Sequence, residues 1–536
     1  MKKTVKRVVS LALASVLAFS LAGCKDSKKE ENTTTKKASN STNTKVTYEK
    51  PTSIKVMWDG TILKEGEEDT DALYKAYEDA YGFKIEWVRP DHSKYAEYVS
   101  QAFASGDIPD VLILSAGNYV TYAAKGALYD FKNDWENSDI RDDNRFTQST
   151  LDTIKAFYYV EGKNGELGLY GLPTTRGNGC LTYVRKSYLT KAGISADSIK
   201  TFDDYYNMLV AIKDKCGLEY VVTSAGYISA EAPYVNYLPE FFQDAYPDFY
   251  KNAEGKWVDG FQEPAMKSAL ERLSKAYSAQ LLDPAMSTNG TGQARNNFID
   301  GKCAVFSYWA GTWQNTLTVN IGNKFSEFAP DADGYGDVVA LAPIKEVGAY
   351  YDRMAPVCCI TKDANNAAGI YKYFVEPIFD GGDVMSVWMY GAKGAQWDDK
   401  AETITLKGVD YTYTEGQFHW KLVQKGDKFL AKNNIDPLLA LCDYKEGKNP
   451  AGSTQNACIS KLALDSQQLF NDNCKPAPGI KSNSVMSAVA GEIEAARVKA
   501  ATQIIQGEDS YDNIIAEYKK AYGAKIEACL DSLSEE

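Results

Sequence analysis

Side chains suited to binding, rather than to catalysis, stand where predicted strands of this sequence end. Trp58 and Asp59 close the first predicted strand, and Ser115 and Asn118 follow a later one. A tryptophan face beside a carboxylate, together with small polar groups at a helix start, suits a ligand rich in hydroxyl groups. Ligands of open α/β sheets bind beyond the carboxyl ends of the strands, so we expect these residues to line a binding site.

Other candidates for the same site are aromatic or basic residues in predicted loops. The tryptophans of this kind are Trp309, Trp313 and Trp388. For each of them, as for Trp58, an ordinary place in the hydrophobic core is an equally good interpretation. Arg176 follows a Leu-Pro pair, and its guanidinium could bind two ligand oxygens at once, although a structural ion pair would explain it as well. Arg353 is a second arginine of this kind.

Histidine and cysteine, which supply many nucleophiles and metal ligands, are poorly arranged for either role. The two histidines are His92 and His419, which argues against histidine-rich metal sites and against Ser-His-Asp or Cys-His catalysis. The ten cysteines form no Cys-x-x-Cys pair, which argues against zinc or thioredoxin-like chemistry. Segment 331–337 is rich in aspartate but lacks the spacing and final glutamate of an EF-hand, so we interpret it as an acidic turn. We expect no metal and no cofactor.

Length and charge narrow the class of protein further. A chain of 536 residues that is 44% apolar is too hydrophobic for a disordered protein and too long for one ordinary core, so at least two lobes are expected. The formal net charge of -13 argues against a nucleic-acid partner, because nucleic-acid binding needs a basic surface.

The N-terminus predicts an exported protein. Basic residues precede an apolar run over 8–23, which is too short for a membrane span and is typical of a signal peptide, residues 1–23. The run ends in Leu-Ala-Gly-Cys, which resembles the lipobox of bacterial lipoproteins and implies acylation of Cys24. The alternative is a cysteine that follows an ordinary cleavage site by coincidence. If the resemblance holds, residues 24–50 are the lipidated cysteine and a polar, flexible linker, and we expect a lipid to hold the protein at the extracellular face of the cell membrane.

The elements that must position the candidate residues alternate along the chain. Apolar runs predict strands at 54–58, 83–88 and 111–114, and helical spacing predicts helices at 71–81 and 95–103 between them. Thr201 and Asp204 form a predicted capping box that opens another helix. This order predicts an α/β fold with parallel-rich sheets and helices on both faces.

Several short segments also agree, in order, with motifs of a known family. Their residues are Gly-Asp-Ile-Pro-Asp at 106–110, Tyr-Gly-Leu-Pro at 170–173, Leu-Thr-Tyr-Val-Arg-Lys at 181–186, Thr-Phe-Asp-Asp at 201–204, Phe-Ile-Asp-Gly-Lys-Cys-Ala-Val at 298–305 and Gln-Ile-Ile-Gln-Gly at 503–507. With the lipobox, they resemble the bacterial extracellular solute-binding proteins of family 1, the sugar-binding lipoproteins of ABC transporters. The length and the predicted hairpin at 411–420 resemble the longer, Gram-positive members.

This resemblance implies a two-lobed periplasmic-binding-protein-like fold with a hinge between the lobes. Lobe 1 is expected to contain 51–175 and about 345–400, and lobe 2 to contain 176–344 and about 401–536. The crossovers between them are placed near 173–180, 341–345 and 390–410, and Tyr183 near the first crossover becomes a further binding residue.

The resemblance also implies a function. A carbohydrate, most simply an oligosaccharide, binds between the lobes of a monomer and is delivered to the permease subunits of an ABC importer. A peptide or a sugar acid is an alternative ligand. An anchored glycoside hydrolase is an alternative function, but it needs two opposed carboxylates, and the sequence has no recognisable signature of such a pair.

Overall fold

The structure is a computed structural model that describes most of the chain from residue 47 onward. The described residues are 47–58, 70–91, 94–138, 140–141, 146, 148–173, 179–228, 238–331, 333–352, 354–406, 409–425, 428–431, 460–478 and 483–534. The predicted signal peptide, Cys24 and the linker up to residue 46 lie outside these ranges, as do Asp59, His92, Arg176 and Arg353. Within the described ranges, no helix has the length and apolar character that a membrane span requires.

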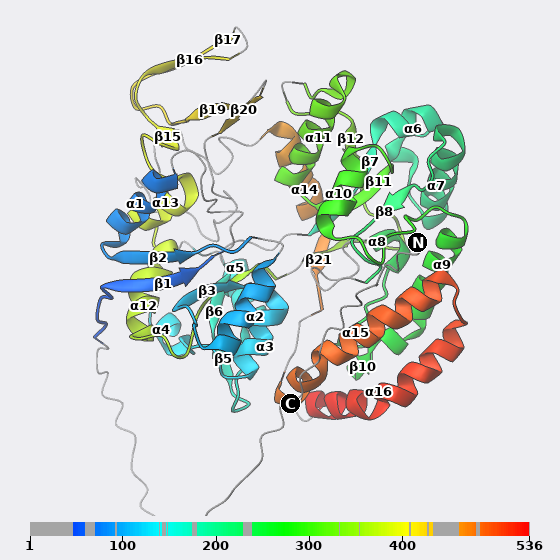
Figure 1. The fold of residues 1–536 in the computed structure, drawn as a ribbon, viewed down its shortest axis with the longest axis horizontal. Coiled ribbons are helices and arrows are strands. Elements are labelled where there is room, and N and C mark those ends of the chain that lie inside the picture. The colour runs from blue at the N-terminus through cyan, green and yellow to red at the C-terminus, as the bar shows by residue number, and fades with distance from the viewer. Residues whose placement is uncertain are drawn as a thin grey trace, which may run out of the picture. The chain divides into compact units, whose positions relative to one another are not determined.

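The first sheet contains the predicted alternation of strands and helices. Its strand order is β2-β1-β3-β14-β6, and its first three strands run parallel (Figure 1). The bounds are β1 Ser53–Met57, α1 Thr70–Tyr81, β2 Lys84–Val88, α2 Tyr95–Ser105, β3 Val111–Leu114, β6 Gly171–Pro173 and β14 Val357–Ile360. Every residue of β3 and β14 is buried, as expected for central strands with both faces covered.

Local sequence explains where these helices lie and end. Leu73, Tyr77 and Tyr81 recur every four residues in α1, and all three are buried against the first sheet's core. Gly106 ends α2 in a left-handed conformation with φ of 80°, and its N–H bonds to the carbonyl of Ala102. The segment 106–110 therefore begins as a helix cap and delivers the chain into β3.

The second sheet is mixed, and so is the first, and each contains at least one parallel pair of strands. The second has the order β12-β7-β11-β8, and only β8 and β11 run parallel. The bounds are β7 Cys180–Arg185, β8 Val222–Thr223, β11 Val305–Trp309 and β12 Val338–Ala340. In the first sheet β14 is antiparallel to β3 and β6. In both sheets the antiparallel pairs involve the strands by which the chain enters or leaves, because the chain arrives there from the other sheet rather than through a βαβ crossover.

Helices surround the second sheet. The capping box of Thr201 and Asp204 is present and opens α7, Phe202–Cys216. The other helices are α6 Lys186–Ala192, α8 Pro239–Phe242, α9 Pro264–Ser278, α10 Thr291–Ile299, α11 Thr312–Lys324 and α14 Lys461–Asp472. The C-terminal segment is helical as predicted, with α15, Ser484–Gln506, and α16, Tyr511–Ser534, side by side in Figure 1.

Two hydrophobic cores divide the chain, and each combines segments that are far apart in sequence. The first core draws its buried residues from 54–172 and 357–418, and the second from 180–350 and 470–533. Between Leu172 and Cys180 the chain passes from the first core to the second. It returns to the first core between Tyr350, which is buried in the second core, and Val357, which is buried in the first.

Two aromatic side chains late in the sequence, Trp397 and Phe418, belong to the first core. Phe418 stacks on Trp397 with ring centroids 5.2 Å apart, and both side chains are buried in the first core. Strand β18, His419–Trp420, also pairs with β15, Trp397–Asp398. Among the residues that the structure describes, the next one buried in the second core is Phe470.

An aromatic cluster fills the first core between the sheet and α13, Asp383–Tyr390. The Trp388 ring lies 4.8 Å from that of Trp58 and 4.6 Å from that of Tyr77, measured between centroids. The Trp388 indole N–H donates a 2.8 Å hydrogen bond to the hydroxyl of Tyr81. Trp388 thereby joins β1, α1 and α13.

We expect Trp388→Ala to lower the free energy of unfolding by about 3–5 kcal/mol, because it leaves a cavity among the rings and the Tyr81 hydroxyl without its donor. Urea unfolding measures this loss, with Tyr98→Ala as the control because Tyr98 is 44% exposed. Equal effects of the two substitutions would contradict the structural role of Trp388.

Candidate functional site

The predicted binding residues of the first core fall into two environments. Ser115 is exposed at the start of α3, Ala116–Ala124, and Asn118 is half-buried in its first turn. The Ser115 side chain makes no capping bond to the helix, so its hydroxyl is not committed there. Both residues follow β3 directly, as the sequence predicts.

Trp58 and Trp388, in contrast, are core residues in this structure. They are 0% and 1% exposed, and each covers the other's ring, so neither offers a free face to a ligand. The two indoles lie between the first sheet and α13, where apolar burial places them. Of the two roles that the sequence left open for these tryptophans, packing in the core is the one seen in the structure. The sequence pattern alone could not distinguish a core tryptophan from a ligand-binding one.

The second core carries the aromatic turn, by which we mean residues 308–313 at the end of β11 and the start of α11. Trp309 and Trp313 are half-buried, and both pack against the edge of the second core. Tyr308 is buried and meets the Trp313 ring edge to face, with centroids 5.0 Å apart. The turn therefore presents two partly exposed indoles over a packed base.

Hydrogen bonds from distant segments hold this turn. The Tyr183 hydroxyl donates to the carbonyl of Trp309 at 2.8 Å, and the N–H of Ala310 donates to the carbonyl of Gly179 at 2.9 Å. The N–H of Gly311 donates to the hydroxyl of Ser466 on α14 at 3.0 Å. Gly311 has a φ of 75°, and a Cβ there would meet Gln467 at 2.8 Å, so only glycine fits.

Tyr183, a predicted ligand contact, is fully buried in this structure and supports the turn from below. Burial raises the pKa of its hydroxyl well above the usual value, which keeps it a donor to Trp309. Its position on β7 explains this placement, because Tyr183 pairs with Phe306 in the centre of the sheet.

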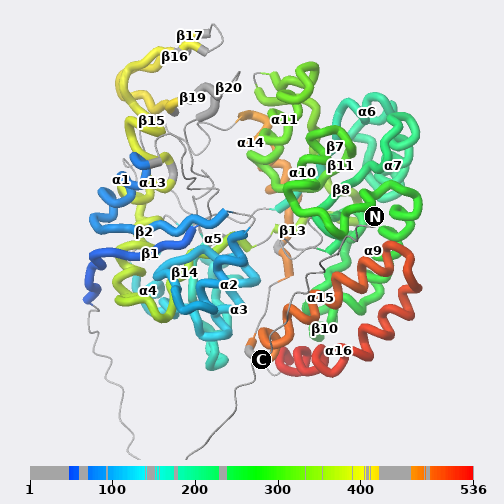
Figure 2. Tube along the Cα trace, viewed as in Figure 1, coloured from blue at the N-terminus to red at the C-terminus, as the bar shows by residue number. Residues whose placement is uncertain are grey.

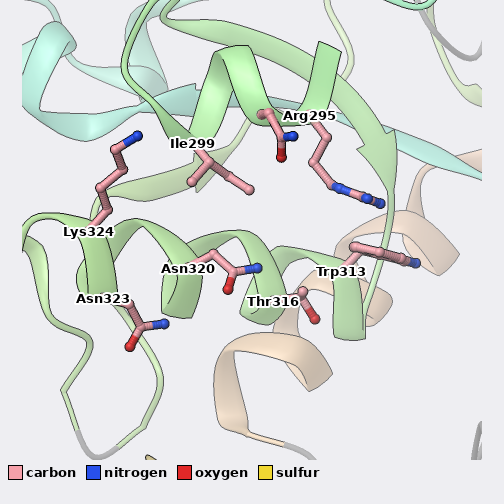
Figure 3. A pocket seen from close by; sticks show the side chains of 8 residues that line it. Arg295, Ile299, Trp313, Thr316, Asn320, Asn323 and Lys324 are labelled. Atoms are coloured by element: carbon pink, nitrogen blue, oxygen red, sulfur yellow. The ribbon is translucent and has the colours of Figure 1, made fainter. Parts of the chain in front are cut away.

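A groove of about 510 Å³ lies between α10 and α11, next to the aromatic turn (Figure 3). Its volume is within the range of small-molecule sites. It is lined by Arg295, Asn296, Ile299, Trp313, Thr316, Asn320, Asn323 and Lys324. None of these side chains is a carboxylate, and most can exchange hydrogen bonds with a polar ligand.

Only Trp313 of the groove residues was a candidate from sequence, and Arg295, which lies beside it, is one of those that the sequence analysis missed. Its guanidinium carbon lies 5.0 Å from the ring centre of Trp313, and Nη1 is 3.5 Å from the hydroxyl of Tyr308. A signal was present, since Ala294 and Phe298 are buried on one face of α10 and leave Arg295 on its polar side. That periodicity indicates an exposed arginine but does not say that α11 lies opposite.

Among the residues that the structure describes, no group of three or more histidine, cysteine, aspartate or glutamate side chains is placed to hold a metal ion. The described cysteines are free, and Cys180, Cys303, Cys358, Cys359 and Cys529 are buried. Burial raises the pKa of Cys358 to about 12 and so disfavours its thiolate.

Glu240 on α8 is an acidic residue deep inside the second core. It is 1% exposed, and burial raises its pKa from the usual 4.5 to about 7, although Thr182 opposes the shift in part. Because the folded protein binds this proton more tightly than the unfolded chain does, stability falls as the pH rises from about 4.5 to about 7.

We expect Glu240→Gln to remove this loss and to stabilise the protein at pH 8 by up to about 3 kcal/mol relative to the original chain. Urea unfolding between pH 4 and pH 8 would measure it, with the exposed Glu254→Gln as the matched control. A pH dependence that Glu240→Gln leaves unchanged would contradict a buried carboxyl that titrates near neutrality.

Known proteins resemble this chain in sequence and in structure. Residues 61–375 match the family described as bacterial extracellular solute-binding protein. Among curated protein sequences, none matches the chain. The alginate-binding protein AlgQ2, in a calcium-free crystal structure, is 15% identical with a TM-score of 0.58, over 90% of this chain and 97% of that one.

Two further solved structures have the same fold. The N-glycan transport protein NgtS of Streptococcus pneumoniae, in complex with Man5GlcNAc, is 16% identical with a TM-score of 0.53, over 90% of this chain and 98% of that one. Lmo0181 of Listeria monocytogenes, in complex with cycloalternan, is 14% identical with a TM-score of 0.53, over 88% and 99%. The likeness confirms the expected periplasmic-binding-protein-like α/β fold, built here from mixed sheets.

Proposed function

This chain belongs to the bacterial extracellular solute-binding protein family, and from that membership we propose that it captures a carbohydrate for an ABC importer. The family assigns the chain a binding role in transport rather than a catalytic one, which sets aside the hydrolase alternative. Family membership does not by itself identify the ligand as a carbohydrate, so this part of the proposal rests on the site.

The observation that carries the proposal is the aromatic turn beside the groove. A sugar ring has an apolar face and a rim of hydroxyl groups, so it needs an aromatic plate and neutral polar partners together. Trp309 and Trp313 supply half-exposed indoles, and Asn296, Asn320 and Asn323 supply amides. A carbohydrate ligand is also in keeping with two proteins of this fold that were crystallised with Man5GlcNAc and with cycloalternan.

The two cores correspond, in this proposal, to the two lobes that close on the ligand. Ser115 and Asn118 then serve the first lobe, together with Asp59 and Arg353, whereas Arg176 is the first residue of the expected second lobe. Trp309 and Trp313 serve the second. A ligand that contacts both lobes stabilises the closed state over the open one.

Trp309→Ala should weaken binding about ten-fold or more, because an aromatic plate under a sugar ring contributes about 1.4 kcal/mol or more. Calorimetry of residues 51–536 with a panel of plant and host oligosaccharides first identifies a ligand and then measures the variant. Trp257→Ala is the matched control, since Trp257 is a half-buried tryptophan on the hairpin strand β10, Trp257–Asp259.

Two results bear directly on Trp309. An unchanged melting temperature with lost affinity supports the plate. A variant that melts early but binds normally once folded shows that Trp309 serves only the core, and an absence of binding to every oligosaccharide contradicts the carbohydrate proposal itself.

We further propose that Cys24 carries a lipid that anchors the protein outside the cell membrane. The support is the Leu-Ala-Gly-Cys sequence after an apolar run, followed by a polar tract that cannot form a core. In cells fed a labelled fatty acid, Cys24→Ala should abolish labelling, whereas Cys474→Ala, at a half-buried cysteine of the second core, should not. Label retained by Cys24→Ala would contradict the anchor.

A further inference from the structure

Arg295 differs from the other cation of the groove between α10 and α11. Lys324 forms an ion pair with Asp300, so its charge is compensated. Arg295 has no carboxylate within ion-pair distance among the residues that the structure describes, and the groove has no carboxylate in its lining. We propose that the groove binds an acidic oligosaccharide and that Arg295 pairs with a carboxylate of its sugar units.

This inference rests on the proposed carbohydrate function and adds the ligand's charge. The arginine is already positioned for the task. Its guanidinium lies over the Trp313 ring and within 3.5 Å of the Tyr308 hydroxyl, which restrains the side chain. One such contact leaves most of the five guanidinium donors available, and their fork matches the two oxygens of a carboxylate. A restrained guanidinium gives up less freedom on binding than a mobile one.

The remaining lining suits the neutral part of such a ligand. Asn320 and Thr316 line the groove from α11, and Trp313 and Arg295 stand together at one end with Lys324 at the other (Figure 3). From Trp313 to Lys324 the helix rises about 16 Å, at about 1.5 Å per residue. That length exceeds a single sugar ring, so the groove favours a chain of several units.

The charges close to the groove, rather than the acidic charge of the whole chain, determine whether an anionic ligand is favoured. The formal net charge is -13, yet the charged side chains that line the groove are Arg295 and Lys324, and with Asp300, the ion-pair partner of Lys324, these three groups sum to one positive charge. Because charges farther away than about 10 Å are largely screened at physiological salt, the groove attracts an anion despite the overall balance.

The test uses residues 51–536 and matched pairs of glycans. Each uronic-acid oligosaccharide of a panel of galacturonate, glucuronate and mannuronate trimers is compared with its carboxyl-reduced, neutral form by calorimetry. We expect at least one acidic trimer to bind ten-fold or more tightly than its neutral form. Arg295→Gln should remove that preference, and added salt should weaken it.

Lys302→Gln is the matched control, because Lys302 is an exposed lysine just after α10 and does not line the groove. It removes the same charge from the chain and should leave the preference intact. Equal binding of acidic and neutral forms, or a preference that Arg295→Gln leaves in place, overturns the acidic ligand but keeps the carbohydrate function. Binding of neither form also overturns the acidic ligand, and the oligosaccharide panel used with Trp309→Ala then shows whether the carbohydrate function fails as well.

Discussion

The candidate site depends on three hydrogen bonds that fix the short turn after β11. Their partners are Tyr183 on β7, Gly179 at the first crossover and Ser466 on α14, so strands and a helix from three parts of the chain converge there. The Ser466 hydroxyl also lies 3.4 Å from that of Tyr183, which ties two of these supports together. With the turn fixed, the first turn of α11 and its Trp313 are fixed too, and through Trp313 the guanidinium of Arg295.

The candidate tryptophans of the two cores differ in role, because those of the first core are buried and those of the second are partly exposed. In the first core Trp58 and Trp388 serve packing. The indole nitrogens of Trp58 and Trp87 and the hydroxyl of Tyr77 are buried and have no hydrogen-bond partner among the residues that the structure describes. Such unsatisfied groups cost free energy, which the dense aromatic contacts around Trp388 must offset. In the second core, Trp309 and Trp313 stay at the edge and keep part of their surface available.

Sequence patterns predicted the local elements well because these depend on neighbours in the chain. The alternation that leads to β3, the capping box of Thr201 and the helical C-terminus all follow from periodicity and caps. The antiparallel direction of β7 and β14 could not be predicted in this way, because the sequence of a strand that enters from another sheet does not indicate which strand it will pair with. The same limit affected the site, since the burial of Trp58 and the approach of α11 to Arg295 are set by tertiary contacts.

Strand β14 lies between β3 and β6, although more than 180 residues separate it from either one in sequence. In Figure 2 it is labelled close to the N-terminal strands of the first core. As the ribosome makes the chain from its N-terminus, β3 and β6 exist long before the strand that joins them, and both must wait with an unpaired edge. Such edges recruit other strands, so the order of synthesis exposes this sheet to mispairing until residue 360 has emerged.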